Sequence, residues 1–331
     1  MSFEFCEESG LKSILGLDIG YGANKIIYMN SNGEITHQFK FVSAIGITNR
    51  NSFVKDNRIY DFKDHYYYVG DDALRLPSEN MVDITEYKNL EYYAPLFLYK
   101  AIKEIGEIPD IVVTGLSKAQ IENSGYFKDA LSNFEVNGEK FSFEKLYILP
   151  QGAGSKIAID KYGDDFPNEQ KAFTGNSTYI GVDIGMNTTD LWLVTKGKTS
   201  PNLFEGIEHS GVMKIAAEIA KKVKELYGRD IKLHEAEEII NTKVYKLRGQ
   251  RHDFSPIVKQ IKEQYIKDLM TMIYDKYPDQ LDKCDFIYLT GGGSSFFNTS
   301  DNGFIRVPKS NWEFYNAIGF ALWGDLKTRS E

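Results

Sequence analysis

The sequence predicts an α/β protein built from two related halves. Three observations carry this prediction. A short strand–turn–strand pattern occurs twice, buried-strand patterns alternate with helical patterns along the chain, and the length of 331 residues suits two domains or one large bilobal domain. Hydrophobic residues make up 42% of the chain, which is ample for packed cores. We therefore expect a duplicated α/β architecture.

The repeated pattern is "GLDIG" at 16–20 and "GVDIG" at 181–185, an offset of 165 residues. In each copy an apolar run ends in an aspartate, Asp18 or Asp183, and glycines follow. Glycines let backbone N–H groups approach phosphate oxygens closely. A carboxylate at a strand end can hold a hydrated Mg²⁺ ion that bridges phosphates. We interpret the two copies as turns that face each other across a cleft and clamp one nucleotide.

The first half continues with alternating strand and helix patterns. Asn32-Gly33 favours a hairpin turn, and Gly106 ends a stretch with helical spacing. In order, the expected elements are a strand, turn and strand over 13–29, a tyrosine-rich, strand-like stretch over 39–69, a helix over 89–106, a buried strand over 110–116, and a strand, a Pro-Gln-Gly break and a helix start over 145–159.

The second half repeats this alternation. Ser210 is expected to cap an amphipathic helix that Gly228 ends, and Ser255 with Pro256 is expected to start another helix. In order, the expected elements are a strand, turn and strand over 178–195, helices over 209–228, 233–247 and 255–277, a buried strand from 285 that runs into the triple glycine at 291–293, and a closing helix over 311–326.

Composition excludes several classes of protein. The formal charge of −8 argues against non-specific nucleic-acid binding, which needs a basic surface. Cys6 and Cys284 fit neither a zinc site nor a disulfide framework, so we expect two buried free thiols in a reducing cytosol. The acidic N-terminus lacks the apolar core of a signal peptide, and no run of about 18 apolar residues is present to span a membrane. A cytoplasmic protein is expected.

A single Asp-Gly turn is usually only a hairpin, but this chain holds a set of motifs in a fixed order. The set resembles the phosphate-1, connect-1, phosphate-2, adenosine and connect-2 motifs of the actin, sugar kinase and DnaK-type ATPase superfamily. The resemblance runs from about Ile14 to Leu326. Within that superfamily the chain resembles the bacterial actin-like proteins of plasmid segregation, the ParM or StbA group. The five motifs are "DIGYGANK", "LPQGAGS", "DIGMNTTD", "LTGGGSSFF" and "NAIGFALWG".

The resemblance implies an actin-like ATPase fold, in which two duplicated ribonuclease-H-like α/β domains surround a nucleotide cleft. Domain I is expected at 1–154 plus 312–331, with a small subdomain inserted at about 34–70. Domain II is expected at 155–311, with a small helical subdomain at about 206–255.

The resemblance also implies roles for single residues. Gln151 lies where the family places the residue that orients the attacking water; ParM proteins commonly carry glutamate there, whereas actin carries glutamine. Because glutamine cannot act as a base, we expect Gln151 to position water and Asp183 to polarise it, with Asp18 in the first phosphate loop. Asp18 and Asp183 are expected to hold Mg²⁺ through water. The other expected nucleotide contacts are Gly20, Tyr21, Gly22, Asn24, Lys25, Gly185, Asn187, Thr188, Glu238, Gly291, Gly292 and Gly293.

The implied function is a nucleotide-dependent, filament-forming protein that hydrolyses ATP or GTP after polymerisation. Filaments of this kind position plasmid DNA through a small DNA-binding adaptor on a centromere-like site, which agrees with the acidic charge. Self-association head to tail is expected, with no direct contact to nucleic acid or membrane. A cell-shape or organelle-positioning actin homologue shares every motif and stays open as an alternative.

Other members of the superfamily fit less well. A small-molecule kinase would place an aspartate base in the break "LPQGAGS", which has none; Asp160 follows about nine residues later. A DnaK-type chaperone would need a C-terminal substrate domain. An activator ATPase would need cysteines for an iron–sulfur cluster, which Cys6 and Cys284 do not supply.

Overall fold

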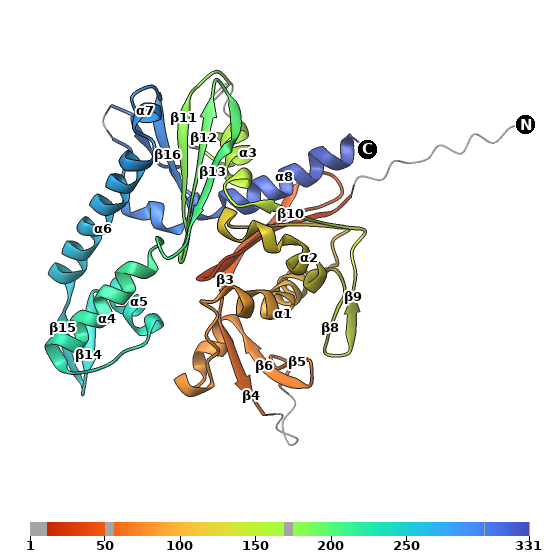
Figure 1. The fold of residues 1–331 in the computed structure, drawn as a ribbon. Helices are drawn as coiled ribbons and strands as arrows, with labels where there is room; N and C mark the ends of the chain where they lie inside the picture. The colour runs from red at the N-terminus through yellow and green to blue at the C-terminus, as the bar shows by residue number, and fades with distance from the viewer. Residues whose placement is uncertain (1–11, 50–55, 169–174, 301, 331) are drawn as a thin grey trace, which may run out of the picture. The chain divides into compact units, whose positions relative to one another are not determined.

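The computed structural model describes residues 12–49, 56–168, 175–300 and 302–330 (Figure 1). Cys6 lies outside these residues. Cys284 is half-buried, and burial raises the pKa of its thiol. Among the described residues, no helix combines the length and the apolar composition needed to cross a bilayer.

The chain divides into two compact units, and each unit contains parts of the chain that are far apart in sequence. Unit 1 comprises residues 1–116, 120–159 and 314–331, whereas unit 2 comprises 117–119 and 160–313. The insertion expected at about 34–70 contributes an edge strand and a separate three-stranded sheet to unit 1.

Unit 1 is built on a five-stranded sheet of order β10-β7-β1-β2-β3. β1 pairs antiparallel with β2 and parallel with β7, and β7 pairs parallel with β10. The strands of this sheet are β1 (Ile14–Ile19), β2 (Ala23–Met29), β3 (Ile35–Val42), β7 (Ile111–Leu116) and β10 (Lys145–Pro150). The smaller strands are β4 (Ile45–Thr48), β5 (Tyr60–Phe62), β6 (His65–Val69), β8 (Phe134–Val136) and β9 (Glu139–Phe141), and the helices are α1 (Tyr87–Ile105), α2 (Ser124–Ser132), α3 (Ala153–Tyr162) and α8 (Tyr315–Arg329).

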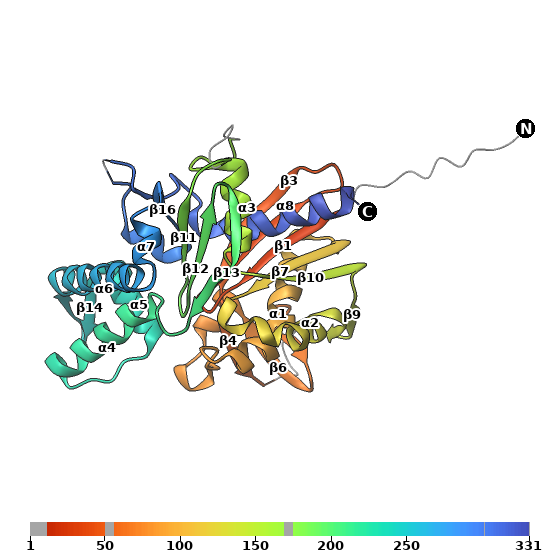
Figure 2. The ribbon, with the colours of Figure 1, turned by 45° about the horizontal axis from the view of Figure 1, so that its top comes forward.

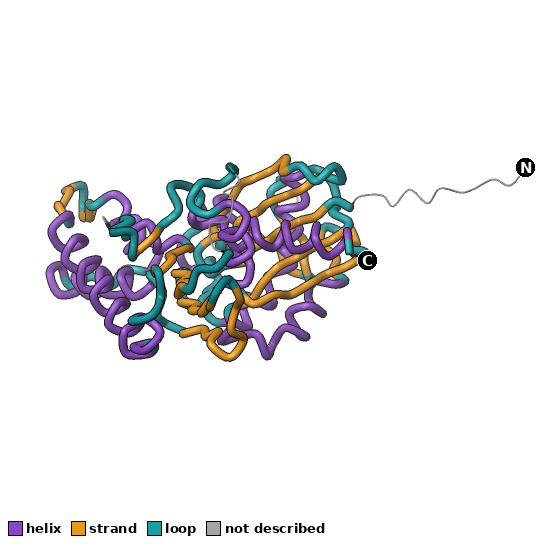
Figure 3. Tube along the Cα trace, turned by 90° about the horizontal axis from the view of Figure 1, so that it is seen from above, coloured by secondary structure: helices purple, strands orange, loops and turns teal. Residues whose placement is uncertain are grey.

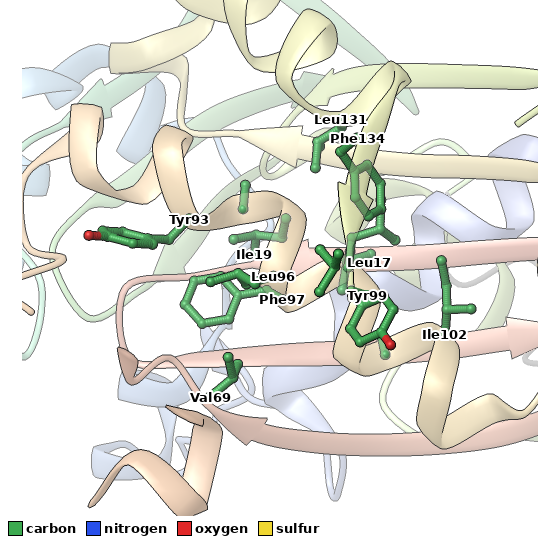
Figure 4. Packing of buried hydrophobic residues seen from close by; sticks show 14 of the residues in the cluster. Leu17, Ile19, Val69, Tyr93, Leu96, Phe97, Tyr99, Ile102, Leu131 and Phe134 are labelled. Carbon is green, nitrogen blue, oxygen red and sulfur yellow. The ribbon is translucent and has the colours of Figure 1, made fainter. Parts of the chain in front are cut away.

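Helices cover both faces of the unit 1 sheet, because side chains alternate between the faces of a strand. Leu15 and Leu17 of β1 join a buried cluster with residues of α1 such as Phe97, which Figure 4 shows around the labelled Leu17. On the opposite face α8 lies so close to Gly16 that a Cβ there would meet the Ala317 carbonyl oxygen at 2.2 Å. Figure 2 shows α8 and α1 on the two sides of this sheet. α8 therefore rests directly on the strand that ends at Asp18.

Unit 2 repeats this sheet with the order β13-β12-β11-β16-β17. β11 pairs antiparallel with β12 and parallel with β16, as β1 does with β2 and β7. The matching strand order confirms the duplicated α/β architecture. The strands are β11 (Tyr179–Ile184), β12 (Thr189–Thr195), β13 (Lys198–Ile207), β14 (Val244–Leu247), β15 (Gln250–Asp253), β16 (Phe286–Thr290) and β17 (Ile305–Arg306), and the helices are α4 (Met213–Tyr227), α5 (Leu233–Thr242), α6 (Ser255–Lys276) and α7 (Pro278–Leu281).

The helices α4, α5 and α6 pack against one another within unit 2, as the purple segments of Figure 3 show. The helix expected over 233–247 is wrong in its second half, because α5 ends at Thr242 and Val244–Leu247 forms strand β14. A turn at Arg248-Gly249, where both residues have positive φ, pairs β14 with β15 and so favours strand over helix there. Ser210 does not cap α4: the cap is Val212, and the Ser210 hydroxyl donates to the Ile207 carbonyl.

Candidate functional site

The first Asp-Gly turn joins β1 to β2 in unit 1. Asp18 lies opposite Lys25 in the register, and the Gly20 amide donates to the Ala23 carbonyl at 3.2 Å. Lys25 Nζ lies 3.2 Å from Asp18 Oδ2, and both side chains are largely buried. A Cβ on Gly20 would meet the Ala23 carbonyl oxygen at 2.9 Å and Lys25 Nζ at 3.0 Å, so only glycine fits without a shift. The turn thus presents a carboxylate and an ammonium group side by side.

Gln151 reaches the same carboxylate from a distant part of the chain. It follows β10, and its backbone amide donates to the Leu116 carbonyl at 2.7 Å. Its Nε2 donates to Asp18 Oδ1 at 2.7 Å. Because the carboxylate can only accept, this bond commits the amide nitrogen and leaves Gln151 Oε1 as the acceptor end of the side chain.

The other expected contacts of this turn are half-buried or buried. Tyr21 packs against the core of unit 1, and the Gly22 carbonyl accepts from the Ser43 amide. Asn24 is fully buried, and its Nδ2 donates to the Ser43 hydroxyl, which in turn donates to the Gly20 carbonyl. Asn24 therefore braces the turn from inside unit 1 rather than presenting its side chain at the surface.

The second Asp-Gly turn joins β11 to β12 in unit 2 and has the same geometry. The Gly185 amide donates to the Thr188 carbonyl at 2.9 Å, the counterpart of the Gly20–Ala23 bond 165 residues earlier. Asp183, Asn187 and Thr188 are all buried. The two turns share one backbone hydrogen-bond pattern in the two units, as the sequence repeat predicts.

A segment that the sequence analysis did not assign holds the second turn in place. The amide of Gly211 donates to the Asn187 carbonyl, and a Cβ on Gly211 would meet the Met186 carbonyl oxygen at 2.4 Å. His209 Nδ1 lies 3.1 Å from Asn187 Oδ1. The sequence signal was "HSG" just before α4, which is too short to be distinctive by itself.

The triple glycine after β16 packs on the second turn. Gly291 has a φ of +83°, and a Cβ there would lie 2.2 Å from Asp183 Oδ1. Gly293 is confined by Ile184 in the same way, whereas Gly292 has open space around its Cβ position. Two of the three glycines are thus required by packing within unit 2, and only Gly292 has room for a side chain.

Two acidic residues differ from the expectation. Glu238 is exposed on α5. The preceding residue, Glu237, is the half-buried one, and burial raises the pKa of its carboxyl. Glu237 is therefore the better candidate on this helix for a contact that depends on desolvation.

Asp190 is a further buried carboxylate that the sequence analysis did not assign. It lies opposite Asp183 in the β11–β12 register and is 1% exposed. Its Oδ1 accepts from the Ser117 hydroxyl at 2.9 Å and from the Lys118 amide at 2.8 Å. Asp190 therefore anchors the short segment 117–119 within unit 2.

The carboxylates at the two turns fit a hydrated cation better than a directly ligated one. No group of three or more metal-ligating side chains gathers anywhere in the described ranges. Mg²⁺ characteristically keeps several waters and uses one or two carboxylates plus phosphate oxygens, which Asp18 and Asp183 could supply at their turns.

Two family models match the chain. One describes the N-terminal domain of actin-like proteins and matches residues 16–154. The other describes the C-terminal part of archaeal MreB-like actin homologues and matches residues 181–300. No curated protein sequence matches the chain significantly.

Solved structures share the fold at low sequence identity. The archaeal actin homologue Ta0583 is 18% identical, with a TM-score of 0.74 over 95% of this chain and 99% of that chain. A non-polymerisable quadruple mutant of pCBH ParM is 19% identical, with a TM-score of 0.75 over the same shares. A ParM subunit in a 15-stranded filament from Clostridium botulinum is also 19% identical, with a TM-score of 0.71 over the same shares. The Ta0583 complex with ADP has a TM-score of 0.72 at 18% identity, again over 95% and 99% of the two chains.

These matches and the duplicated sheets with their Asp-Gly turns define the class: the protein has the actin-like ATPase fold. The chain belongs to the actin-like proteins, and its motif-based resemblance to the ParM type is confirmed at the level of the fold.

Proposed function

We propose that the protein is a nucleotide-dependent, filament-forming ATPase or GTPase that hydrolyses its nucleotide after polymerisation. The observation that carries the proposal is the repeated turn: an aspartate at a strand end, followed by a glycine whose amide closes the turn, occurs in the same backbone register in both units. We also propose that the compact units correspond to domain I (1–154 and 312–331) and domain II (155–311).

Nucleotide binding follows from the groups at these turns. Glycine backbone and the Lys25 ammonium group suit phosphate oxygens, and Thr188 adds a hydroxyl at the second turn. Mg²⁺ would be held through water by Asp18 and Asp183 and would neutralise phosphate charge. The archaeal homologue was solved with ADP and Bacillus thuringiensis ParM with ATP, and we extend nucleotide binding from them to this chain.

Hydrolysis is proposed to depend on positioning of a water molecule. Gln151 cannot take a proton, but its Oε1 can accept one hydrogen bond from water while Nε2 stays on Asp18. Asp183 supplies the second acceptor that polarises the water. Catalysis by orientation and charge stabilisation is the general pattern of phosphoryl transfer.

Assembly is proposed to proceed head to tail. A contact between two different faces of a subunit does not close on itself and therefore gives an open filament. The ParM filament from Clostridium botulinum motivates this step. With a formal charge of −8, the filament is expected to reach plasmid DNA through a DNA-binding adaptor rather than directly.

A second role keeps the same biochemistry but a different cargo. The C-terminal model that matches residues 181–300 describes archaeal MreB-like homologues, which favours cell-shape or organelle positioning as the alternative. Loss of plasmid inheritance after deletion of the gene from its plasmid would support segregation. Unchanged inheritance with altered cell form would support the alternative.

The test is light scattering of the purified protein after addition of Mg-ATP or Mg-GTP, with phosphate release followed in the same sample. We expect scattering to rise above a threshold protein concentration and to fall as phosphate appears. The nucleotide that gives this response at the lower concentration is the preferred one. Phosphate release without scattering at any concentration would contradict the filament proposal, and the absence of both signals would contradict the proposal as a whole.

A further inference from the structure

We propose that Asn316, on the closing helix α8, is the positioning residue that fixes Gln151 for hydrolysis. This inference rests on the proposed function and names a residue outside the expected set of nucleotide contacts. The side chain of Asn316 caps helix α3 and thereby holds the turn that carries Gln151.

The carrying observation is a buried amide oxygen that accepts three hydrogen bonds. Asn316 Oδ1 accepts from the Gly152 amide at 2.8 Å, from the Ser155 amide at 3.1 Å and from the Ser155 hydroxyl at 3.1 Å. Asn316 is 4% exposed and Ser155 is fully buried. All of these groups belong to unit 1.

These bonds replace a cap that the local sequence cannot provide. α3 begins at Ala153, so Gly152 occupies the capping position and has no side chain to accept the first free amides of the helix. Gly152 has a φ of +83°, a conformation that side-chain-bearing capping residues such as serine or aspartate rarely adopt. The acceptor therefore comes from Asn316, 164 positions away.

Close backbone contact between α3 and α8 brings Asn316 within reach. A Cβ on Gly319 would lie 1.8 Å from the Gly154 carbonyl oxygen, and a Cβ on Gly154 would lie 2.6 Å from the Asn316 carbonyl oxygen. The two helices can meet at this distance only because both positions are glycine. α8 also rests on Gly16 of β1, the strand that ends at Asp18.

One helix therefore sets the positions of both partners of the Gln151–Asp18 hydrogen bond. α8 supports β1 below Asp18 and, through Asn316, holds Gly152 directly after Gln151. Displacement of a positioning group by about 1 Å can lower a rate on the order of 10²-fold. Loss of the Asn316 cap should therefore slow turnover without removing any atom that contacts nucleotide.

The experiment compares Asn316→Ala and Asn316→Asp in the full chain with Gln151→Ala and with the double variant. We expect Asn316→Ala to lower kcat for phosphate release at least about tenfold, with nucleotide affinity unchanged within about twofold. Asn316→Asp keeps an acceptor oxygen at a helix start and should restore most of the rate. Because both residues act through one group, the double variant should be no slower than Gln151→Ala.

A matched control separates positioning from general loss of stability. Val136→Ala removes buried side-chain atoms of β8 in the same unit and should lower the melting temperature while kcat stays at the wild-type value. Amide hydrogen exchange should show faster exchange at Gly152 and Ser155 in Asn316→Ala but not in Asn316→Asp.

Three outcomes would overturn the inference. The first is an unchanged kcat in Asn316→Ala while Gln151→Ala is slow. The second is a double variant slower by the product of the two single effects. The third is a fall in nucleotide affinity that accounts for the whole effect. Absence of turnover in the wild-type protein would instead overturn the proposed function, and this inference with it.

Discussion

Gln151 Nε2 donates to Asp18 Oδ1 at 2.7 Å, although the two residues are 133 positions apart in the chain. Lys25 Nζ lies 3.2 Å from the other oxygen of the same carboxylate. The aspartate therefore has a cation on one side and a neutral amide on the other. This arrangement fixes which end of the Gln151 amide is available to water.

Gln151→Ala should slow hydrolysis on the order of 10²-fold while nucleotide binding stays intact, because the side chain orients water and is not placed on the phosphates. The measurement is single-turnover phosphate release together with nucleotide affinity from a fluorescent analogue. Thr328→Ala, at the far end of α8, removes a local hydrogen bond and serves as the control. Near-normal turnover of Gln151→Ala would remove Gln151 from the site.

Gly291→Ala should destabilise the protein by about 1–3 kcal/mol, because the residue has a φ of +83° and the new Cβ would lie 2.2 Å from Asp183 Oδ1. The displaced carboxylate should also abolish hydrolysis. Gly292→Ala is the matched variant for stability, since nothing lies within 4 Å of its Cβ position. The check is urea denaturation of both variants, and equal free energies of unfolding would contradict the assigned packing.

Asp190→Ala should lower the free energy of unfolding by about 1–3 kcal/mol for each donor left unpaired, and two donors are affected, Ser117 Oγ and the Lys118 amide. Asp190→Asn keeps an acceptor oxygen and should have a smaller effect. Ser117→Ala removes only one of the two bonds and should fall between wild type and Asp190→Ala. Urea denaturation orders the three variants, and a different order would show that Asp190 does not anchor this segment.

Glu237→Gln should change how stability depends on pH. Burial raises the pKa of the Glu237 carboxyl above its ordinary value of 4.5, so the folded state binds the proton more tightly than the unfolded state. The stability linked to this group is present below pH 4.5 and is lost as pH rises through the raised pKa. We therefore expect Glu237→Gln to be more stable than wild type at neutral pH, with a smaller difference at acidic pH below 4.5.

Thermal denaturation from about pH 4 to about pH 8 measures this effect, because that range brackets the titration of a carboxyl whose pKa is raised. Glu238→Gln is the control, because Glu238 is exposed on the same helix. A stability gain of equal size in both variants would show that burial of Glu237 is not the cause.

Local sequence patterns predicted much of the fold. The hairpin at Asn32-Gly33, the stop of α1 at Gly106 and the stop of α4 at Gly228 follow from single-residue conformational preferences, and the structure confirms them. The helix expected to run through Val244–Leu247 is wrong because the following Arg248-Gly249 turn pairs that stretch with β15. Strand pairing is a tertiary property, and it outweighed the weak helical pattern.

The sequence by itself determined the two Asp-Gly turns, since a strand end, an aspartate and a glycine are written next to one another at Asp18 and again at Asp183. Only the tertiary structure decided what surrounds them. Gln151 meets Asp18, Asn316 binds the Gly152 amide, and Asp190 binds Ser117, across 133, 164 and 73 positions of the chain. Such contacts depend on how strands and helices pack, because short-range residue preferences carry no information about which distant segment will supply a hydrogen-bond partner.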